Sequence, residues 1–161
     1  ALPISGALTL LLYTMISSLG SLTSLDVSKT NQRRAQKTLS RYLTTIQHEK
    51  INNVNYLNTD LENFNFKELN IPIDTVITDV PEPWIFFEKN KIINSTHWVS
   101  YLPSISQISK IKEMLIKNEF EDIEVKEVIV RDWLVEGKIL RPSNKLISHT
   151  GFIISGKFIK Y

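Results

Sequence analysis

The chain has 161 residues, of which 42% are hydrophobic and 22% are charged, as is typical of a folded domain with its own core. The absence of cysteine excludes disulfides and thiolate metal sites, and three widely separated histidines predict no metal site. The net charge of +2 permits an anionic partner without requiring one. The longest apolar run, residues 8–16, is too short to span a bilayer, so we expect no membrane partner.

The first half of the chain is predicted to alternate between helices and strands. In chain order, the hydrophobic pattern predicts a helix over residues 5–18, a strand over 21–27, a helix over 30–47, and strands over 54–59 and 73–78. Strands that alternate with helices are typical of βαβ units with a parallel sheet. The expected fold class is therefore α/β.

The second half begins in the same way and then changes. A strand is predicted over residues 98–102, a helix over 105–118, and late strands over 123–133 and 152–159. No long helical pattern separates the two late strands. Because a parallel pair would need a crossover, we expect them to form an antiparallel pair at one edge of the sheet.

Three successive predicted strands end on an acid, namely Asp26, Asp60 and Asp79. In open parallel sheets, ligands bind at the carboxyl ends of the strands, so the three carboxylates are predicted to border one site. Structural roles remain open as alternatives. Asp26 could cap the next helix, and Asp60 could stabilise a turn.

A turn of small residues, Ser5-Gly6-Ala7, opens the first predicted helix and would let a ligand approach its N-terminus. Asp26 follows Gly6 by about 20 residues, the spacing at which a nucleotide-binding βαβ unit places an acid that accepts hydrogen bonds from ribose hydroxyls. The alternative is that Ser5 is an ordinary helix N-cap.

The segment VITDVPEPW, residues 76–84, places Asp79 on a loop braced by Pro81 and Pro83. A carboxylate on so rigid a loop can accept a hydrogen bond or proton from an exocyclic amine. A helix start is the alternative, with Asp79 as the cap, the prolines in the first turn and Trp84 in the core.

Basic side chains recur every four residues on the second predicted helix, at Lys29, Arg33, Lys37 and Arg41. A second basic cluster contains Lys138, Arg141 and Lys145. Such stripes are typical of a solvated helix face, and they also permit phosphate binding.

Several segments together resemble the S-adenosylmethionine-dependent tRNA adenine-N1 methyltransferases, which modify a T-loop adenine. VITDVPEPW is similar to the family's D-x-P-x-P-W loop, WVSYLPSISQI to its S-Y-x-P-x-x-x-Q segment, and RPSNKLISHTGFI to its RP…HTG ending. SGALT resembles the end of the methyltransferase glycine loop, and SLDVSKTNQRRAQKTL resembles the acid and helix that follow. EVIVRDWLV is similar to the mitochondrial branch.

The resemblance implies a Rossmann-like class I methyltransferase fold with S-adenosylmethionine as cofactor and roles for particular residues. Asp79 would be the catalytic acid that orients the adenine, with Tyr101 lining the pocket. The cofactor would be bordered by Ser5, Gly6, Ala7, Leu8, Asp26, Val27, Asp60, Leu61 and Asp79. The substrate would be contacted or supported by Pro81, Gln107, His149 and Thr150.

The chain also departs from the family pattern. Leu2 and Ile4 stand at the first two glycines of the G-x-G-S-G loop. The sheet's first central strand and the family's N-terminal β-rich domain are not found in residues 1–161, which are expected to form one methyltransferase-like domain. The alternative function is therefore a catalytically inactive subunit of this fold that binds RNA or a partner protein. A methyltransferase of another RNA or of protein is a third reading.

The resemblance further implies a set of partners and a cellular location. We expect tRNA or another RNA as the macromolecular partner, a homo- or hetero-oligomer, and a reaction that uses no metal. An intracellular protein is expected, with mitochondria favoured over the nucleus or cytoplasm.

Overall fold

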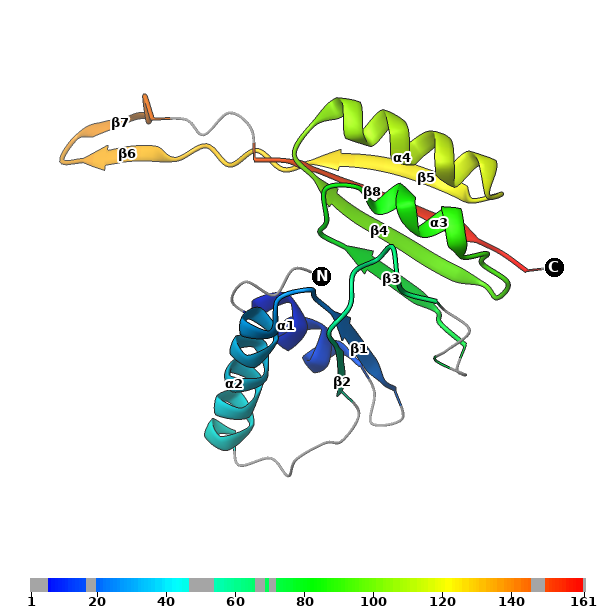
Figure 1. Ribbon diagram of the computed structural model, residues 1–161. Helices are drawn as coiled ribbons and strands as arrows, with labels where there is room; N and C mark the ends of the chain where they lie inside the picture. The colour runs from blue at the N-terminus through cyan, green and yellow to red at the C-terminus, as the bar shows by residue number, and fades with distance from the viewer. Residues whose placement is uncertain are drawn as a thin grey trace. The chain divides into compact units, whose positions relative to one another are not determined.

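The computed structural model describes residues 6–16, 20–46, 54–65, 69, 72–145 and 150–160. Its helices and strands follow one another along the chain as shown in Figure 1. In order they are α1 (Ala7–Met15), β1 (Leu22–Leu25), α2 (Lys29–Thr45), β2 (Val54–Leu57), β3 (Thr75–Thr78), the 3-10 helix η2 (Pro83–Ile85), α3 (Phe86–Lys89), β4 (Thr96–Leu102), α4 (Ile105–Lys117), β5 (Glu121–Glu127), β6 (Trp133–Glu136), β7 (Ile139–Pro142) and β8 (Phe152–Phe158).

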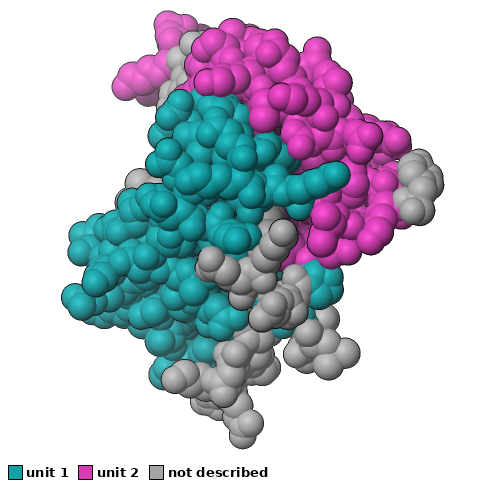
Figure 2. Space-filling model, turned by 45° about the vertical axis from the view of Figure 1, so that its right-hand side comes forward, with its two compact units in different colours: residues 1–72, 77–91 teal, residues 73–76, 92–161 magenta. Residues whose placement is uncertain are grey.

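The chain divides into two compact units, which Figure 2 colours separately. Unit 1 comprises residues 1–72 and 77–91, and unit 2 comprises residues 73–76 and 92–161. The boundary passes through β3.

Unit 1 contains the parallel strand pair of β1 and β2, the helices α1, α2 and α3, and the 3-10 helix η2. β1 pairs with β2 in a register that places Leu22 opposite Val54. Its apolar core contains Tyr13, Leu39 and Leu43. These three side chains come from α1 and α2, so the two helices share one buried cluster.

The amphipathic pattern of α2 explains how this helix packs. Ala35, Leu39 and Leu43 recur at four-residue spacing and are buried, so they form the inner face of the helix. Ser28 caps its N-terminus, and the side-chain oxygen accepts from the Asn31 N–H at 3.3 Å. The helix predicted over residues 30–47 is therefore confirmed for the residues that the structure describes.

Unit 2 is built on a sheet with strand order β3-β4-β8-β5. β8 runs antiparallel to both β4 and β5, and β5 lies at the edge. The predicted antiparallel pair at one edge is therefore confirmed. In Figure 1 the helix α4 runs along one face of this sheet.

Period-two burial along β4 shows why one face of the sheet is covered. Trp98, Ser100 and Leu102 are fully buried, while His97 and Tyr101, which alternate with them on the other face, are exposed. Ile111 and Leu115 of α4 are also fully buried. The core of unit 2 thus lies between α4 and the inward-facing residues of the sheet.

One predicted strand is wrong in its extent. The strand expected over residues 123–133 ends at Glu127, and an unforeseen hairpin of β6 and β7 follows. Gly137 occupies the tight turn with φ of 55°, a backbone conformation that favours glycine. Two apolar runs that flank this glycine, WLVE and ILRP, were the available signal. Figure 1 shows the hairpin projecting from the sheet.

The described strands form separate ladders and not one continuous sheet. β1 and β2 make one two-stranded sheet, β3 begins the four-stranded sheet, and the β6–β7 hairpin is a third. The mixed α/β fold class is confirmed.

None of the described helices has the length and apolar character needed to cross a membrane.

Candidate functional site

Asp26 follows directly after β1 and is almost fully buried, with 5% of its surface exposed. Its Oδ1 accepts a hydrogen bond from the Ser28 N–H at 2.7 Å. Its Oδ2 is buried and has no hydrogen-bond partner among the residues that the structure describes. A buried carboxylate oxygen without a partner is costly, so this atom is suited to accept a hydrogen bond from a ligand.

Two amide side chains hold the backbone around Asp26, and we call Gln32 and Asn58 the amide clamp. Gln32 Nε2 donates to the carbonyl oxygens of Leu57 at 2.5 Å and Asp26 at 3.3 Å. Asn58 Nδ2 donates to the carbonyl oxygens of Asp26 and Val27, both at 2.8 Å. The clamp ties the end of β1 to the end of β2 and thereby fixes the position of Asp26.

The capping alternative for Asp26 is wrong, because Ser28 is the N-cap of α2. Asp26 instead closes a two-residue turn through its Oδ1. Val27, a predicted cofactor residue, has a side chain that is 65% exposed. Val27 is therefore connected with the candidate site only as the residue that follows Asp26 in the sequence.

Asp60, the second predicted strand-end acid, has a different environment. Its Oδ1 accepts from the Asn63 N–H at 2.6 Å, and its Oδ2 accepts from Asn63 Nδ2 at 2.9 Å. Leu61 lies within this turn. The turn alternative is therefore confirmed for Asp60, and both carboxylate oxygens already have a protein donor.

Gly6 is the N-cap of α1, with φ of 73°, and as a glycine it has no side chain that could cap the helix. A Cβ atom at Gly6 would lie 2.6 Å from the Ala35 Cα. The glycine is therefore required by close packing between α1 and α2, a role the sequence did not reveal. Ala7 and Leu8 form the first turn. Ser5, Leu2 and Ile4 lie outside the described residues.

Asp79 follows β3 and is partly buried. The helix-start alternative is correct for Pro83 and Trp84, since Pro83 opens η2 and both side chains are buried. It is wrong for Asp79, because Glu82 occupies the N-cap position. Asp79 thus precedes a proline-braced turn whose far end is anchored in the core, while Pro81 is exposed.

In unit 2, Tyr101 contacts Thr150 and Gly151, which belong to the HTG ending of the family pattern. Its hydroxyl donates to the Thr150 carbonyl oxygen. A Cβ atom at Gly151, where φ is 150°, would lie 2.5 Å from the tyrosine ring. The motif therefore has a packing role against Tyr101. His149 lies outside the described residues.

Gln107 belongs to the N-terminus of α4. The Ser104 hydroxyl accepts from the Gln107 N–H at 3.3 Å and donates to Gln107 Oε1 at 2.9 Å. The reciprocal contacts of Ser104 and Gln107 resemble a capping box. Its role in the described structure is helix capping, which the S-x-x-Q spacing could have predicted.

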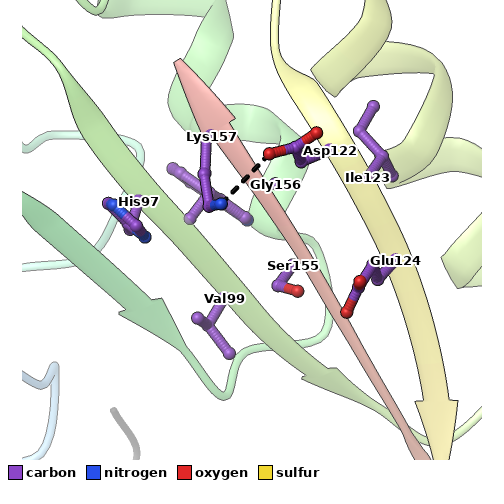
Figure 3. Close-up of a pocket in the computed structure, with 9 residues that line it drawn as sticks. His97, Val99, Asp122, Ile123, Glu124, Ser155, Gly156 and Lys157 are labelled. Atoms are coloured by element: carbon purple, nitrogen blue, oxygen red, sulfur yellow. Dashed lines mark hydrogen bonds and ion pairs between the residues drawn. The ribbon is translucent and has the colours of Figure 1, made fainter. Parts of the chain in front are cut away.

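A pocket on the outer face of the unit 2 sheet contains none of the predicted site residues. It is lined from β4, β5 and β8, and His97, Glu124 and Ser155 are among its side chains (Figure 3). Asp122 and Lys157 form an ion pair across it at 3.0 Å. Lys126 donates a hydrogen bond to Glu124 and lowers its pKa. Exposed ion pairs of this kind are typical of a solvated surface, so they do not by themselves indicate a ligand site in this pocket.

Two further buried polar groups in unit 1 were missed at the sequence level. Ser24 and Tyr56 are directly opposite in the β1–β2 register. Their hydroxyl oxygens are buried without hydrogen-bond partners among the described residues. Burial raises the pKa of Tyr56. Ser24 opens the segment SLDVSKTNQRRAQKTL, but nothing in that segment pairs it with Tyr56, so only the register brings the two together.

The described residues contain no cluster of three or more acidic or histidine side chains that could hold a metal ion.

Comparisons with known proteins bear on the fold and on the family. The TrmI tRNA (m1A58) methyltransferase from Aquifex aeolicus superposes with a TM-score of 0.70 and 26% identity, over 98% of this chain and 60% of its own. A SAM-dependent O-methyltransferase from Thermotoga maritima gives a TM-score of 0.80 at 22% identity, over 99% of this chain and 57% of its own. The Rossmann-like methyltransferase fold is thereby established.

Sequence relatives agree with the structural ones. A Methanocaldococcus jannaschii protein named tRNA (adenine(57)-N(1)/adenine(58)-N(1))-methyltransferase TrmI is 29% identical over 168 residues, covering 92% of this chain and 60% of the relative. The tRNA (adenine(58)-N(1))-methyltransferase TrmI from Thermus thermophilus is 26% identical, covering 94% of this chain and 57% of the relative. The chain thus spans somewhat more than half the length of these relatives. Residues 4–150 match the family model for the GCD14 subunit of the tRNA methyltransferase complex. The chain therefore belongs to the GCD14 family of tRNA methyltransferase subunits.

Proposed function

We propose that this protein binds S-adenosylmethionine and transfers its methyl group to N1 of an adenine in tRNA. The observation that carries the proposal is Asp26, a buried carboxylate at the carboxyl end of a parallel strand with one unpartnered oxygen. Family membership and the relatives' printed activities support the same reaction.

The residues of unit 1 fit the cofactor in kind. Asp26 Oδ2 would accept a hydrogen bond from a ribose hydroxyl, as acids at this place in nucleotide-binding units do. The amide clamp holds that carboxylate in position before the ligand arrives, which lowers the entropic cost of binding. Asp60 would contribute less, because Asn63 donates to both of its oxygens.

The bound cofactor would supply an electrophilic methyl group on a sulfonium sulfur. Adenine N1 would accept that methyl group through its lone pair, and the electrons of the broken carbon–sulfur bond would stay on the sulfur. The adenine ring thereby gains positive charge. Asp79 would accept a hydrogen bond from the exocyclic amine and stabilise that charge electrostatically. The buried Pro83 and Trp84 keep the following turn rigid.

The alternative is an inactive subunit with the same fold. It is favoured by Leu2 and Ile4, which replace glycines in the cofactor loop pattern. Calorimetric titration of the full-length protein with S-adenosylmethionine, repeated with S-adenosylhomocysteine, separates the two functions. We expect binding of both compounds. A folded protein that binds neither compound would support the inactive subunit.

The proposed chemistry is tested at Asp79. We expect Asp79→Ala to lower the rate of tRNA methylation by at least about 100-fold, because it removes the group that stabilises the developing charge. The effect on S-adenosylhomocysteine affinity should be much smaller.

Glu82→Gln is the matched control, since Glu82 is an exposed carboxylate on the same loop. It should methylate tRNA at the rate of the unmodified protein. A folded Asp79→Ala variant with normal activity would remove the catalytic role from Asp79.

We further propose that the protein is an oligomer. Large apolar side chains that are each more than half accessible lie on β6, on the first two residues of β7 and on the segment before β6, namely Val128, Ile129, Val130, Trp133, Val135, Ile139 and Leu140. An isolated two-stranded hairpin is marginally stable, and clustered exposed apolar side chains mark interaction surfaces. Light scattering should give a mass that is a multiple of that of one chain, and Trp133→Lys should lower it. A monomeric unmodified protein would contradict this proposal.

A further inference from the structure

The helix α2 concentrates positive charge. Five of its 17 residues are Lys or Arg, and none of the 17 is Asp or Glu. The whole chain has 19 basic and 17 acidic residues with a net charge of only +2, so the remainder of the chain is net acidic. Such an asymmetry creates a local positive potential that the net charge conceals.

Four of these cations form a continuous line. Lys29, Arg33, Lys37 and Arg41 succeed one another at four-residue intervals, and all four side chains are exposed. Their Cα atoms extend over about 18 Å at the helical rise of about 1.5 Å per residue. Arg34 is also exposed beside this line.

The other exposed side chains of α2 are also hydrogen-bonding groups. They are hydroxyls and one amide, namely Thr30, Gln36, Ser40, Thr44 and Thr45. The large apolar side chains Leu39 and Leu43 are buried on the opposite side of the helix. We call the exposed side of α2, with its cations and hydroxyls, the basic face.

We propose that the basic face of α2 docks the sugar-phosphate backbone of RNA, an inference that rests on the proposed function for the identity of the partner. Phosphate oxygens are contacted in nucleic-acid complexes by Lys and Arg together with hydroxyl and amide side chains, and the basic face presents this set. A surface without carboxylates also avoids repulsion of the phosphates.

Two other anionic partners fit the basic face less well. A protein interface normally has an apolar or aromatic centre, and the basic face exposes no large apolar side chain. An amphipathic helix on a membrane inserts its apolar face, but the apolar face of α2 is occupied by the unit 1 core. The sugar-phosphate backbone of RNA needs neither an apolar interface centre nor an inserted apolar helix face.

The test is a charge reversal with a matched control. Arg33→Glu combined with Arg41→Glu changes two cations of the basic face. Lys112→Glu combined with Lys117→Glu changes two exposed cations on α4 and gives the same net charge. Affinity for tRNA is measured for both variants across a salt series. Circular dichroism verifies that each variant is folded.

We expect the α2 variant to bind tRNA at least about tenfold more weakly at low salt. The magnitude of the slope of log affinity against log salt should decrease by about 1.4–1.8, since each of the two lost phosphate contacts removes roughly 0.7–0.9. The α4 variant should stay within about threefold of the unmodified protein. Arg33→Lys with Arg41→Lys should retain most of the affinity, because backbone phosphates accept from either cation.

Several outcomes would overturn the inference. Equal losses in both variants would assign the effect to net charge, and an unchanged α2 variant would leave the basic face without a role in RNA binding. If the α2 variant loses binding only to phosphatidylserine vesicles or to polyglutamate, the partner is a membrane or an acidic protein.

The same samples separate this inference from the proposed function. Titration with S-adenosylhomocysteine reports the cofactor site independently of tRNA. A protein that binds no cofactor but loses tRNA affinity in the α2 variant would contradict the methyltransferase proposal and support the docking face.

Discussion

The two units differ in how completely they satisfy their buried polar groups. Five buried side-chain atoms lack a hydrogen-bond partner among the described residues, and all belong to unit 1, in Thr9, Tyr13, Ser24, Asp26 and Tyr56. In unit 2, by contrast, buried Trp98 Nε1 donates to Ser100 Oγ at 2.8 Å, and the Thr96 hydroxyl donates to the Ile73 carbonyl oxygen at 2.9 Å.

This difference indicates what each unit contributes. Native proteins leave few buried polar atoms unpaired, and each exception calls for a ligand, a water or a strain-bearing role. Unit 2 satisfies its polar interior with its own side chains, so its described part reads as a structural scaffold. Unit 1 presents an unpartnered carboxylate oxygen beside a clamped strand end, which makes it the unit in which a ligand is expected.

The largest predicted effect tests the close packing of Gly151 against the Tyr101 ring in unit 2. Gly151→Ala should destabilise the protein by roughly 2–4 kcal/mol, because the new methyl would overlap the Tyr101 ring at an unfavourable φ. Chemical denaturation measures the loss.

Gly137→Ala provides the comparison for that prediction. Gly137 also has a positive φ, but a Cβ there would meet no atom within 4 Å. Its substitution should therefore cost only about 1 kcal/mol. Equal costs at the two glycines would show that the contact between Gly151 and Tyr101 contributes nothing beyond backbone strain.

The second prediction compares the two strand-end acids of unit 1. Asp26→Asn should weaken S-adenosylhomocysteine binding by about 10- to 100-fold, since a charged hydrogen bond at a buried site is worth about 1.5–3 kcal/mol. Asp60→Asn should weaken it by no more than about threefold, because Asn63 already donates to both Asp60 oxygens. Calorimetry measures both affinities. Equal losses would mean that the turn at Asp60 opens to the ligand.

A third pair of variants compares a buried hydroxyl that has a hydrogen-bond partner with one that has none among the described residues. Ser100→Ala should cost about 1–3 kcal/mol, because it removes the acceptor of the buried Trp98 N–H. Tyr56→Phe should leave stability unchanged or raise it, because the Tyr56 hydroxyl has no described partner. A loss of more than about 1 kcal/mol for Tyr56→Phe would reveal a partner for that hydroxyl.

Alkaline pH gives a second measure of the Tyr56 environment. Burial raises the pKa of Tyr56 above its ordinary value of 10.0. The unfolded chain therefore loses this proton first, and the contribution to stability is complete below pH 10 and declines as pH rises through the raised pKa. Tyr56→Phe should flatten this part of the curve of unfolding free energy against pH.

Periodicity predicted the helices well, because their apolar faces are local patterns. The apolar spacing of residues 30–47 and 105–118 located α2 and α4 to within about two residues of their described ends. The strand predicted over residues 123–133 was wrong in its extent, since exposed Val128 and Val130 beyond Glu127 gave an apolar pattern without burial. Pattern alone cannot distinguish an apolar residue in the core from one on a projecting segment.

The candidate site was predictable in its residues but not in their environments. Asp26 and Asp60 are indistinguishable as acids that follow short strands. No pattern in the sequence indicated the roles of Gln32 and Asn58. Each amide bridges to a carbonyl oxygen at a strand end that is distant in sequence, and only the fold brings the two together. Gln107 had a local signal, the S-x-x-Q cap, that was assigned instead to the substrate.

By itself, the sequence determined the α/β class, the amphipathic helices, the antiparallel C-terminal pair and the motifs of the tRNA methyltransferase family. These properties depend on local periodicity or on residue identity at short spacing. Only the tertiary structure decided that Asp26 has an oxygen without a partner among the described residues while both Asp60 oxygens accept from Asn63. It also decided that Gly6 and Gly151 make room for Ala35 and Tyr101, and that β5 stops at Glu127. The physical reason is that hydrogen-bond satisfaction and steric fit depend on residues distant in sequence, which only the folded chain brings into contact.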